Sequence, residues 1–150
     1  METKDILYKL RSEKGVSQEE LAARLFVTRQ AVSRWENGET VPNNETLKLL
    51  SIYFNVSINT LLGSPQTLIC QCCGMPLDDL SISRELDGSF REEYCKWCYD
   101  GEKFVYHSVE ELTDFLVENM PLGNWTKEEA RGIFKKQLLT LKHWRDRNET

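Results

Sequence analysis

Two pairs of cysteines carry the clearest chemical signal in this chain of 150 residues. The motif Cys-x-x-Cys begins at Cys70 and again at Cys95, with 21 residues between the two copies. Soft thiolates in a tetrahedral arrangement suit Zn²⁺, and each two-residue spacing lets one pair span an edge of the metal site. The pattern therefore predicts one Zn²⁺ ion, held by Cys70, Cys73, Cys95 and Cys98.

A fifth thiol, Cys72, lies inside the first motif, and an odd number of cysteines argues against a disulfide framework. Because Cys72 directly precedes Cys73, the two cannot span one metal edge without strain, so Cys72 is expected to be spare. The metal is expected to be structural, and the alternative is a zinc or redox sensor in which Cys72 exchanges into the site. A catalytic metal is least favoured, because four thiolates leave no position for water. His107 and His143 are expected on the surface or in the core rather than as ligands.

A second group of side chains, within residues 28–37, has the chemistry to read DNA. Val32 and Trp35 recur at helical spacing, so one face of this segment is predicted to be buried. On the opposite face, arginine can donate two hydrogen bonds to guanine, and glutamine can pair in the same way with adenine. The residues predicted on that face are Arg29, Gln30, Ser33 and Arg34.

Five short helices are predicted within residues 1–63, and they position this face. Residues that cap helices precede four of them, namely Ser17, Thr28, Asn43 or Asn44, and Ser57. The helices Ser17–Leu25 and Thr28–Asn37 are joined by a tight turn. This is the arrangement in which the second helix enters the major groove of DNA.

The net charge of -5 is unevenly distributed along the chain. Residues 1–63 hold eight basic and eight acidic residues, which leaves 11 basic and 16 acidic residues for the remainder. Because attraction to phosphate depends on local cationic groups, only the first part suits a DNA surface. Zinc-bound thiolates would add about two negative charges to the second part, where an acidic surface can receive a protein partner.

The sequence SQEELAARLFVTRQAVSRWENGETVP, residues 17–42, strongly resembles the helix-turn-helix of the lambda-repressor/Cro type, the xenobiotic-response-element family of bacterial regulators. The resemblance extends over residues 3–63 and implies a transcriptional regulator that binds operator DNA. It implies that bases are read by Arg29, Gln30 and Arg34. It implies that phosphates are contacted by Gln18, Thr28, Ser33 and Asn37.

The chain departs from this family at Phe26, which occupies a turn position where glycine is frequent. A left-handed residue other than glycine costs about 1 kcal/mol there. That cost is tolerable if the ring packs against the domain.

Beyond residue 63 the pattern changes. The segments Ser81–Leu86 and Ser89–Tyr94 flank Asp87-Gly88, which predicts a β-hairpin with a two-residue turn and positive φ at both turn positions. Capping boxes at Ser108 and Thr126 begin two amphipathic helices, 108–118 and 126–145, which should pack as a helical hairpin. Their apolar stripes are also a candidate dimer interface.

The sequences CQCCGMPL and EEYCKWCYDGEKF, followed by a helical end in LLTLKHW, resemble a zinc-ribbon domain family that occurs in bacteria alone or behind helix-turn-helix domains. The resemblance covers residues 70–145, and its ligand pattern matches the two Cys-x-x-Cys pairs. It implies a fold but no mechanism.

We therefore predict a mainly α protein with a five-helix lambda-repressor-like domain at 1–63, a linker at 64–69, and a zinc-ribbon β-hairpin with a C-terminal helical hairpin at 70–150. The expected function is sequence-specific binding of double-stranded DNA as a homodimer, without enzymatic activity. No apolar run has the length of a membrane span and no signal peptide is recognisable, so we expect a cytoplasmic protein. The alternatives are an antitoxin-like or other protein-interaction module that also binds DNA, and a zinc- or redox-sensing regulator.

Overall fold

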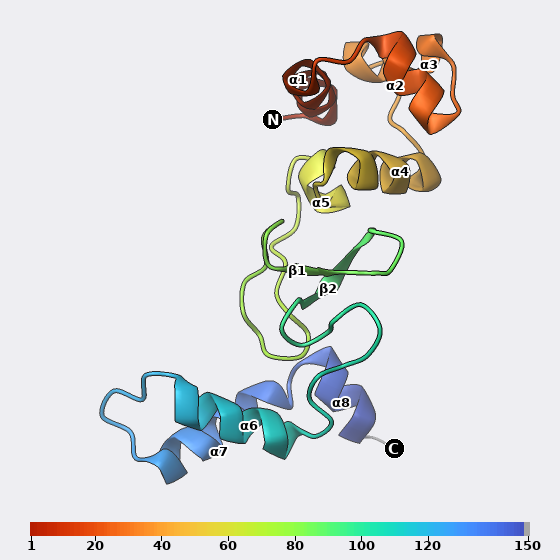
Figure 1. Ribbon diagram of the computed structural model, residues 1–150. Coiled ribbons are helices and arrows are strands. Elements are labelled where there is room, and N and C mark those ends of the chain that lie inside the picture. Colours follow the sequence, from red (N-terminus) through yellow and green to blue (C-terminus); the bar gives the residue numbers. More distant parts are fainter. Residues whose placement is uncertain (149–150) are drawn as a thin grey trace. The chain divides into compact units, whose positions relative to one another are not determined.

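A computed structural model describes residues 1–148 and contains eight helices and two strands within that range (Figure 1). The prediction of a mainly α protein is confirmed. The chain divides into two compact units, of which the first comprises Met1–Thr67 with Asp87–Phe90 and the second the remaining residues. The last two residues of the predicted domain 70–150 lie outside the described part. Along residues 1–148, every helix is too short or too polar to cross a membrane.

The first unit contains the five predicted helices, which are α1 (Thr3–Lys14), α2 (Gln18–Leu25), α3 (Arg29–Asn37), α4 (Asn44–Phe54) and α5 (Ile58–Leu61). Their apolar faces meet in one core that includes Leu7, Leu21, Val32, Trp35 and Leu50. The predicted caps are confirmed at Ser17, Thr28 and Ser57, and Asn43 rather than Asn44 caps α4. Each of these side-chain oxygens accepts a hydrogen bond from the backbone N–H three residues later, which satisfies a donor that the helix itself leaves unpaired.

The turn between α2 and α3 passes through Phe26 in the left-handed conformation, with φ of 58°. The condition that its ring packs against the domain is not met, because the side chain is 90% exposed. The turn is instead closed by the backbone, since Val27 N–H donates to the carbonyl of Ala22 at 3.0 Å.

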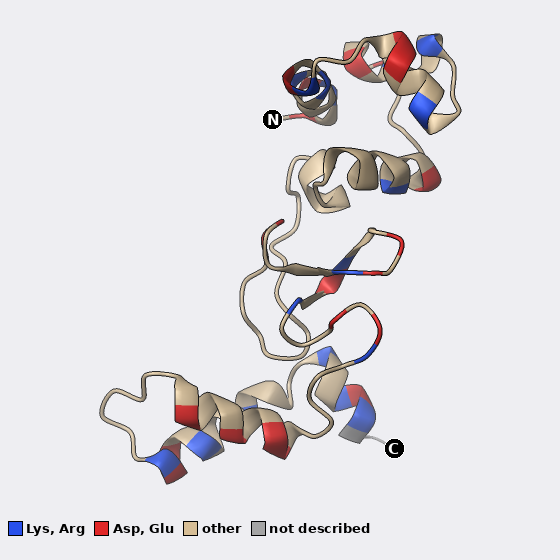
Figure 2. Cartoon of the chain, in the orientation of Figure 1, with Lys and Arg blue, Asp and Glu red and all other residues tan. Residues whose placement is uncertain are grey.

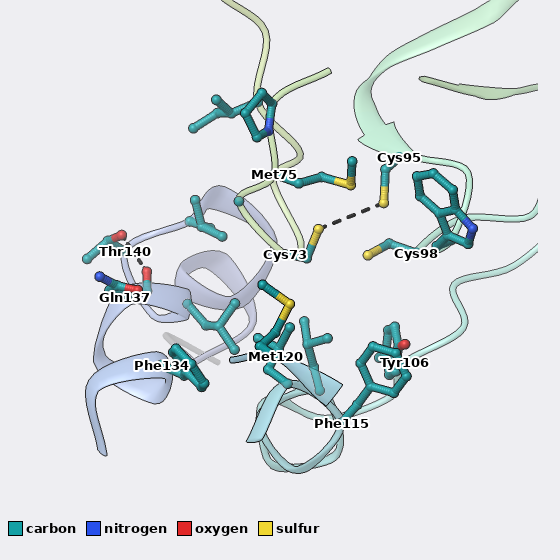
Figure 3. A pocket seen from close by; sticks show the side chains of 18 residues that line it. Cys73, Met75, Cys95, Cys98, Tyr106, Phe115, Met120, Phe134, Gln137 and Thr140 are labelled. Carbon is teal, nitrogen blue, oxygen red and sulfur yellow. Dashed lines mark hydrogen bonds between the residues drawn. The ribbon is translucent and has the colours of Figure 1, made fainter. Parts of the chain in front are cut away.

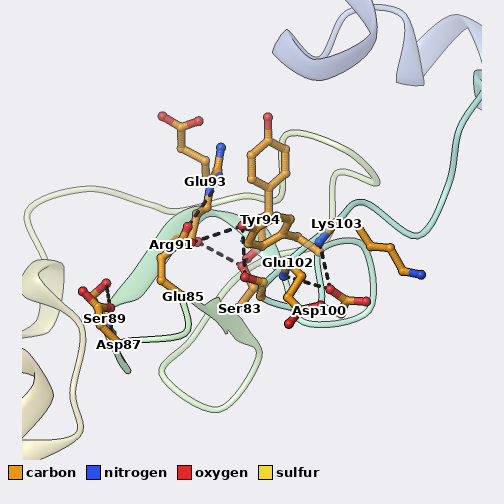
Figure 4. Close-up of polar contacts among 12 residues, drawn as sticks. Ser83, Glu85, Asp87, Ser89, Arg91, Glu93, Tyr94, Asp100, Glu102 and Lys103 are labelled. Atoms are coloured by element: carbon orange, nitrogen blue, oxygen red, sulfur yellow. Dashed lines mark hydrogen bonds and ion pairs between the residues drawn. The ribbon is translucent and has the colours of Figure 1, made fainter.

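β1 (Ile82–Arg84) and β2 (Phe90–Cys95) form an antiparallel pair, which belongs to the second unit except for Phe90. The predicted two-residue turn is wrong, because residues 85–89 join the strands and only Gly88 among them has positive φ. The Asp87 carboxylate orders this loop by accepting hydrogen bonds from the Ser89 N–H at 2.9 Å and hydroxyl at 2.6 Å (Figure 4). These bonds favour the ionised carboxylate and help to lower the pKa of Asp87 to about 2.

Helices α6 (Val109–Asn119) and α7 (Lys127–Leu138) form the predicted hairpin and run side by side (Figure 1). Acidic residues of α6 face basic residues of α7 (Figure 2). The cross-helix ion pairs are Lys127 with Glu118, Arg131 with Asp114, and Lys135 with Glu110. The predicted capping box at Thr126 is confirmed with both of its hydrogen bonds, whereas Ser108 caps α6 through its hydroxyl.

The prediction of one continuous helix over residues 126–145 is wrong. Residues 139–141 separate α7 from a further helix, α8 (Lys142–Asn148). The first N–H groups of α8 bond to Gln71, Lys142 N–H to its side-chain oxygen and His143 N–H to its carbonyl, each at 3.2 Å. Gln71, which is 71 residues from Lys142 in the sequence, thus satisfies the first N–H groups of α8. A local helical pattern cannot reveal such a distant contact.

Candidate metal centre and nucleic-acid interface

The two Cys-x-x-Cys motifs converge in the second unit. The sulfur atoms of the four predicted ligands all lie within 4.8 Å of one another. Figure 3 draws three of these residues, Cys73, Cys95 and Cys98, and Cys73 Sγ is 3.8 Å from Cys95 Sγ. A tetrahedral site with Zn–S bonds of about 2.3 Å requires sulfur atoms about 3.8 Å apart. The four thiols therefore fit a tetrahedral metal site, and the set is Cys70, Cys73, Cys95 and Cys98.

Local backbone structure explains why each pair of thiols points inward. An antiparallel bridge between Ile69 and Pro76 closes the first motif, and a second bridge between Tyr99 and Phe104 follows the second motif. After Cys73 the chain reverses at Gly74, whose φ of 83° favours a residue without Cβ. Each motif is thus a tight knuckle that presents two sulfur atoms to one point.

Backbone N–H groups from both knuckles point to Cys70 Sγ. The N–H groups of Cys72 and Cys73 point to it at 3.4 Å each, and the N–H of Cys95 at 3.3 Å. The thiols of Cys73, Cys95 and Cys98 also donate toward it, and these bonds lower the pKa of Cys70 well below its usual value. A thiolate in this position is the form that a metal ion binds.

The donor set itself identifies the metal class that fits. Four thiolates are soft ligands, and a tetrahedral sulfur cage matches Zn²⁺ or an iron–sulfur centre better than the oxygen-binding cations Mg²⁺ and Ca²⁺. Cys73 is partly exposed, whereas the other three ligand thiols are buried. Once a metal is bound, four protein ligands close its coordination sphere, and solvent approaches the centre from the side of Cys73.

Cys72, the fifth thiol, is fully buried, and it is not among the four clustered ligand thiols. Its carbonyl accepts a hydrogen bond from the indole N–H of Trp144 at 2.7 Å, which holds α8 against the first knuckle.

His143 lies nearby in the core, with its ring centroid 5.5 Å from that of Tyr94. Burial lowers the pKa of His143 to about 4, so the imidazole is neutral at pH 7. His107 is exposed.

The first unit presents the predicted DNA-reading face on α3. Val32 and Trp35 are buried, while Arg29, Gln30 and Arg34 are exposed on the outer side of the helix. Thr28 and Asn37 are also exposed, and Ser33 is partly buried. All of them lie on one helix that is fixed to the core by its other face.

Gln18, the predicted phosphate contact outside α3, takes part in a buried network. Its side-chain amide donates to the Glu36 carboxylate at 2.6 Å, and Arg11 Nε donates to the same carboxylate at 2.7 Å. Only 5% of the Glu36 side chain and 14% of the Arg11 side chain are exposed. The pair links α1 to α3 and orients Gln18. Sequence reasoning missed it, because residues 25 positions apart have no local pattern.

Two family models match the chain. The family described as "Putative zinc ribbon domain" matches residues 69–145, and the family described as "Helix-turn-helix" matches residues 7–61. The first match covers the metal-binding knuckles and most of α8, and the second covers α2 and α3 with their turn.

Curated relatives carry the same assignment. The HTH-type transcriptional activator BcrR of Enterococcus faecalis is 43% identical over 68 residues, which are 45% of this chain and 33% of BcrR. The SPbeta prophage-derived uncharacterized HTH-type transcriptional regulator YonR of Bacillus subtilis is 34% identical over 82 residues, 46% of this chain and 76% of YonR. The chain thus spans about a third of the length of BcrR.

Among solved structures, the P22 c2 repressor protein in complex with a synthetic operator is 31% identical, with a TM-score of 0.40 over 41% of this chain and 94% of that chain. From the two family matches and the similarity to YonR, the chain belongs to the zinc ribbon family through residues 69–145 and to the helix-turn-helix transcriptional regulators through its N-terminal unit.

Proposed function

We propose that this protein is a sequence-specific transcriptional regulator that binds double-stranded operator DNA, with α3 in the major groove. The observation that carries the proposal is the exposed polar face of α3, opposite its buried Val32 and Trp35. A helix fixed by one face and polar on the other is the form in which helix-turn-helix proteins read DNA. The relatives BcrR and YonR are named as transcriptional regulators, which supports the same conclusion.

Side-chain chemistry assigns the roles on this surface. Arg29 and Arg34 can each donate two hydrogen bonds to guanine O6 and N7, and Gln30 can pair with adenine N6 and N7. The remaining groups suit phosphate contacts, which fix the register of the protein on DNA without reading sequence. These groups are Gln18, Thr28, Ser33 and Asn37.

We further propose that the clustered cysteines bind one Zn²⁺ ion whose role is structural. The ion would supply folding free energy to a unit with a small apolar core, because its ligands come from two separate knuckles. The proposal includes no catalytic step, since a four-thiolate site offers no coordination position for a substrate.

The decisive experiment selects bound sequences from a random duplex pool and then measures affinity for the best duplex and for its point variants. Arg34→Ala removes a base contact, so it should weaken the best duplex by about 1–3 kcal/mol and relax the preference at one base pair. Asn37→Ala removes a phosphate contact and should weaken all duplexes alike.

Lys9→Ala serves as the control, because it removes an exposed positive charge from α1 rather than from α3. Its sequence preference should equal that of the unmodified protein. If Arg34→Ala keeps both the affinity and the sequence preference, α3 is not the reading helix.

A further inference from the structure

The second unit contains a large cavity between the metal-binding knuckles and the α6–α7 hairpin. Its volume is about 990 Å³. In Figure 3, Cys73, Met75 and Cys98 lie on one side of it, and Phe115, Met120 and Phe134 on the other. Pockets that bind small molecules in proteins have volumes of about 300–1,000 Å³ and are lined mainly by apolar and aromatic side chains. The cavity has both properties.

The lining is apolar and carries no charged Asp, Glu, Lys, Arg or His side chain. The uncharged polar groups Gln137 and Thr140 lie at one edge (Figure 3). Three large lining side chains are strongly exposed, Trp97 at 55%, Met120 at 51% and Phe115 at 46%. An exposed group of large apolar side chains around a concave surface commonly marks a binding site.

We propose that this cavity binds a neutral, largely apolar small molecule, which lies against the thiolates of the metal centre. A charged ligand would lose its hydration without gaining a partner of opposite charge from the lining side chains. Anions are excluded further, because a Zn²⁺ ion with four thiolates carries about two negative charges at the cavity wall. The proposal is independent of DNA binding.

The position of Cys73 connects the ligand to the metal centre. Cys73, Cys95 and Cys98 all line the cavity, and Cys73 is the ligand thiol that is partly exposed. A bound molecule would therefore cover the open side of the metal site. Occupancy should slow the attack of thiol reagents on the cluster.

The test uses two probes with the same ring skeleton. N-phenyl-1-naphthylamine is neutral, and 8-anilino-1-naphthalenesulfonate adds only a sulfonate to it. We expect the full-length zinc-loaded protein to bind the neutral probe saturably, with one site per chain, and the sulfonate probe at least about tenfold more weakly. Equal binding of the two probes, or no binding of the neutral one, would overturn the proposal.

Variants at the cavity edge test the location. Phe115→Glu places a carboxylate among the apolar lining at a half-exposed position and should weaken the neutral probe by about tenfold or more. Met120→Glu makes the same change at a second position, in case the first variant does not fold. Leu80→Glu is the matched control, because Leu80 is 83% exposed and lies outside the lining.

A second readout follows the metal centre directly. The disulfide reagent 5,5′-dithiobis(2-nitrobenzoate) oxidises the ligand thiols, and the released zinc is measured with 4-(2-pyridylazo)resorcinol. The neutral probe at saturation should slow zinc release several-fold in the unmodified protein and in Leu80→Glu, but not in Phe115→Glu. An unchanged rate at saturation would place the probe elsewhere. A different result would overturn the proposal: the unmodified protein binds no probe and self-associates, and Phe115→Glu abolishes the self-association. The cavity would then be the binding site for a second copy of this chain.

Discussion

Cys72 and Cys73 are adjacent in sequence and yet differ in what surrounds them. The side chain of Cys72 is buried in the apolar core, and its carbonyl accepts the Trp144 indole N–H, whereas Cys73 Sγ faces the other ligand sulfurs. Cys70, Cys95 and Cys98 share the buried cluster with Cys72. At the scale of single residues, Cys73 therefore differs from Cys72 by belonging to the four-sulfur group and by its partial exposure.

This difference predicts opposite outcomes for serine substitutions. Cys72→Ser should retain one zinc per chain, because it leaves the four clustered sulfurs in place. Cys95→Ser should lose the metal and unfold residues 70–106 while helices α1 to α5 persist, since metal-binding free energy in small zinc domains is largely folding free energy. Elemental analysis of each variant, with thiol labelling, measures both results. Complete zinc loss in Cys72→Ser, with retention in Cys70→Ser or Cys73→Ser, would contradict the ligand set and favour a sensor role for Cys72.

Phe26 offers a stability test at one backbone position. Its ring is 90% exposed, so the left-handed backbone is not offset by packing. Asparagine tolerates this conformation and already occupies it at Asn55, at the end of α4. Phe26→Asn should therefore raise the free energy of unfolding of the first unit by about 0.5–1 kcal/mol. Chemical denaturation measures the change, with Leu62→Asn, an exposed position outside the left-handed region, as the control. A loss of stability would indicate that the ring has a packing role.

At the scale of elements, local signals predicted more than distant contacts did. Helix caps such as Ser17 and Thr28 were predictable, because a capping oxygen and the N–H that it accepts lie three residues apart. The Arg11–Glu36 pair and the start of α8 were not, because tertiary structure brings their partners together. The cysteine cluster spans a long separation too, but its two-residue spacings gave it a recognisable pattern.

The contact between Gln71 and the start of α8 was not predicted from the sequence, and its contribution to stability can be tested. Gln71→Ala deletes the side-chain oxygen that accepts the Lys142 N–H and leaves the backbone carbonyl that accepts the His143 N–H. The free energy of unfolding of the second unit should fall by about 1 kcal/mol. Amide exchange should accelerate at residues 142–145 but not in α6.

Gln137→Ala is the matched control for this change, because Gln137 is exposed and lies near the end of α7 rather than at the start of a helix. The two variants should differ in the exchange of α8. Similar exchange in both would mean that Gln71 does not stabilise the start of α8.

At the scale of the whole molecule, the two units rely on different sources of stability. The first has a core of ten buried apolar side chains shared among five helices. The core of the second consists partly of its own cysteines: three of the nine buried residues in that cluster are candidate metal ligands, and the fourth ligand, Cys73, packs against it. Removal of the metal should therefore affect one unit far more than the other.

A single short recognition helix buries too little surface for operator-level affinity, so we predict that the protein binds DNA as a symmetric dimer. Two copies of α3 would then contact half-sites about 34–36 Å apart, one turn of the double helix. Sedimentation of the protein, free and with its best duplex, measures the stoichiometry. A monomer in both samples would contradict the prediction. The sequence of the selected duplex provides an independent check. A dimer should select an inverted repeat, whereas a monomer should select a single half-site.

The attachment of α8 to the first knuckle has a consequence for protein turnover. Lys142, His143 and Trp144 all bond to residues 71 and 72, which lie between two ligand cysteines. If the metal leaves, the acceptor atoms of residues 71 and 72 are no longer held in fixed positions, and these hydrogen bonds weaken. Residues 139–148 then detach and become accessible to proteases. Proteolysis follows the population of such opened states. We expect cellular levels of this protein to fall when zinc is scarce, so its abundance would itself record the zinc supply.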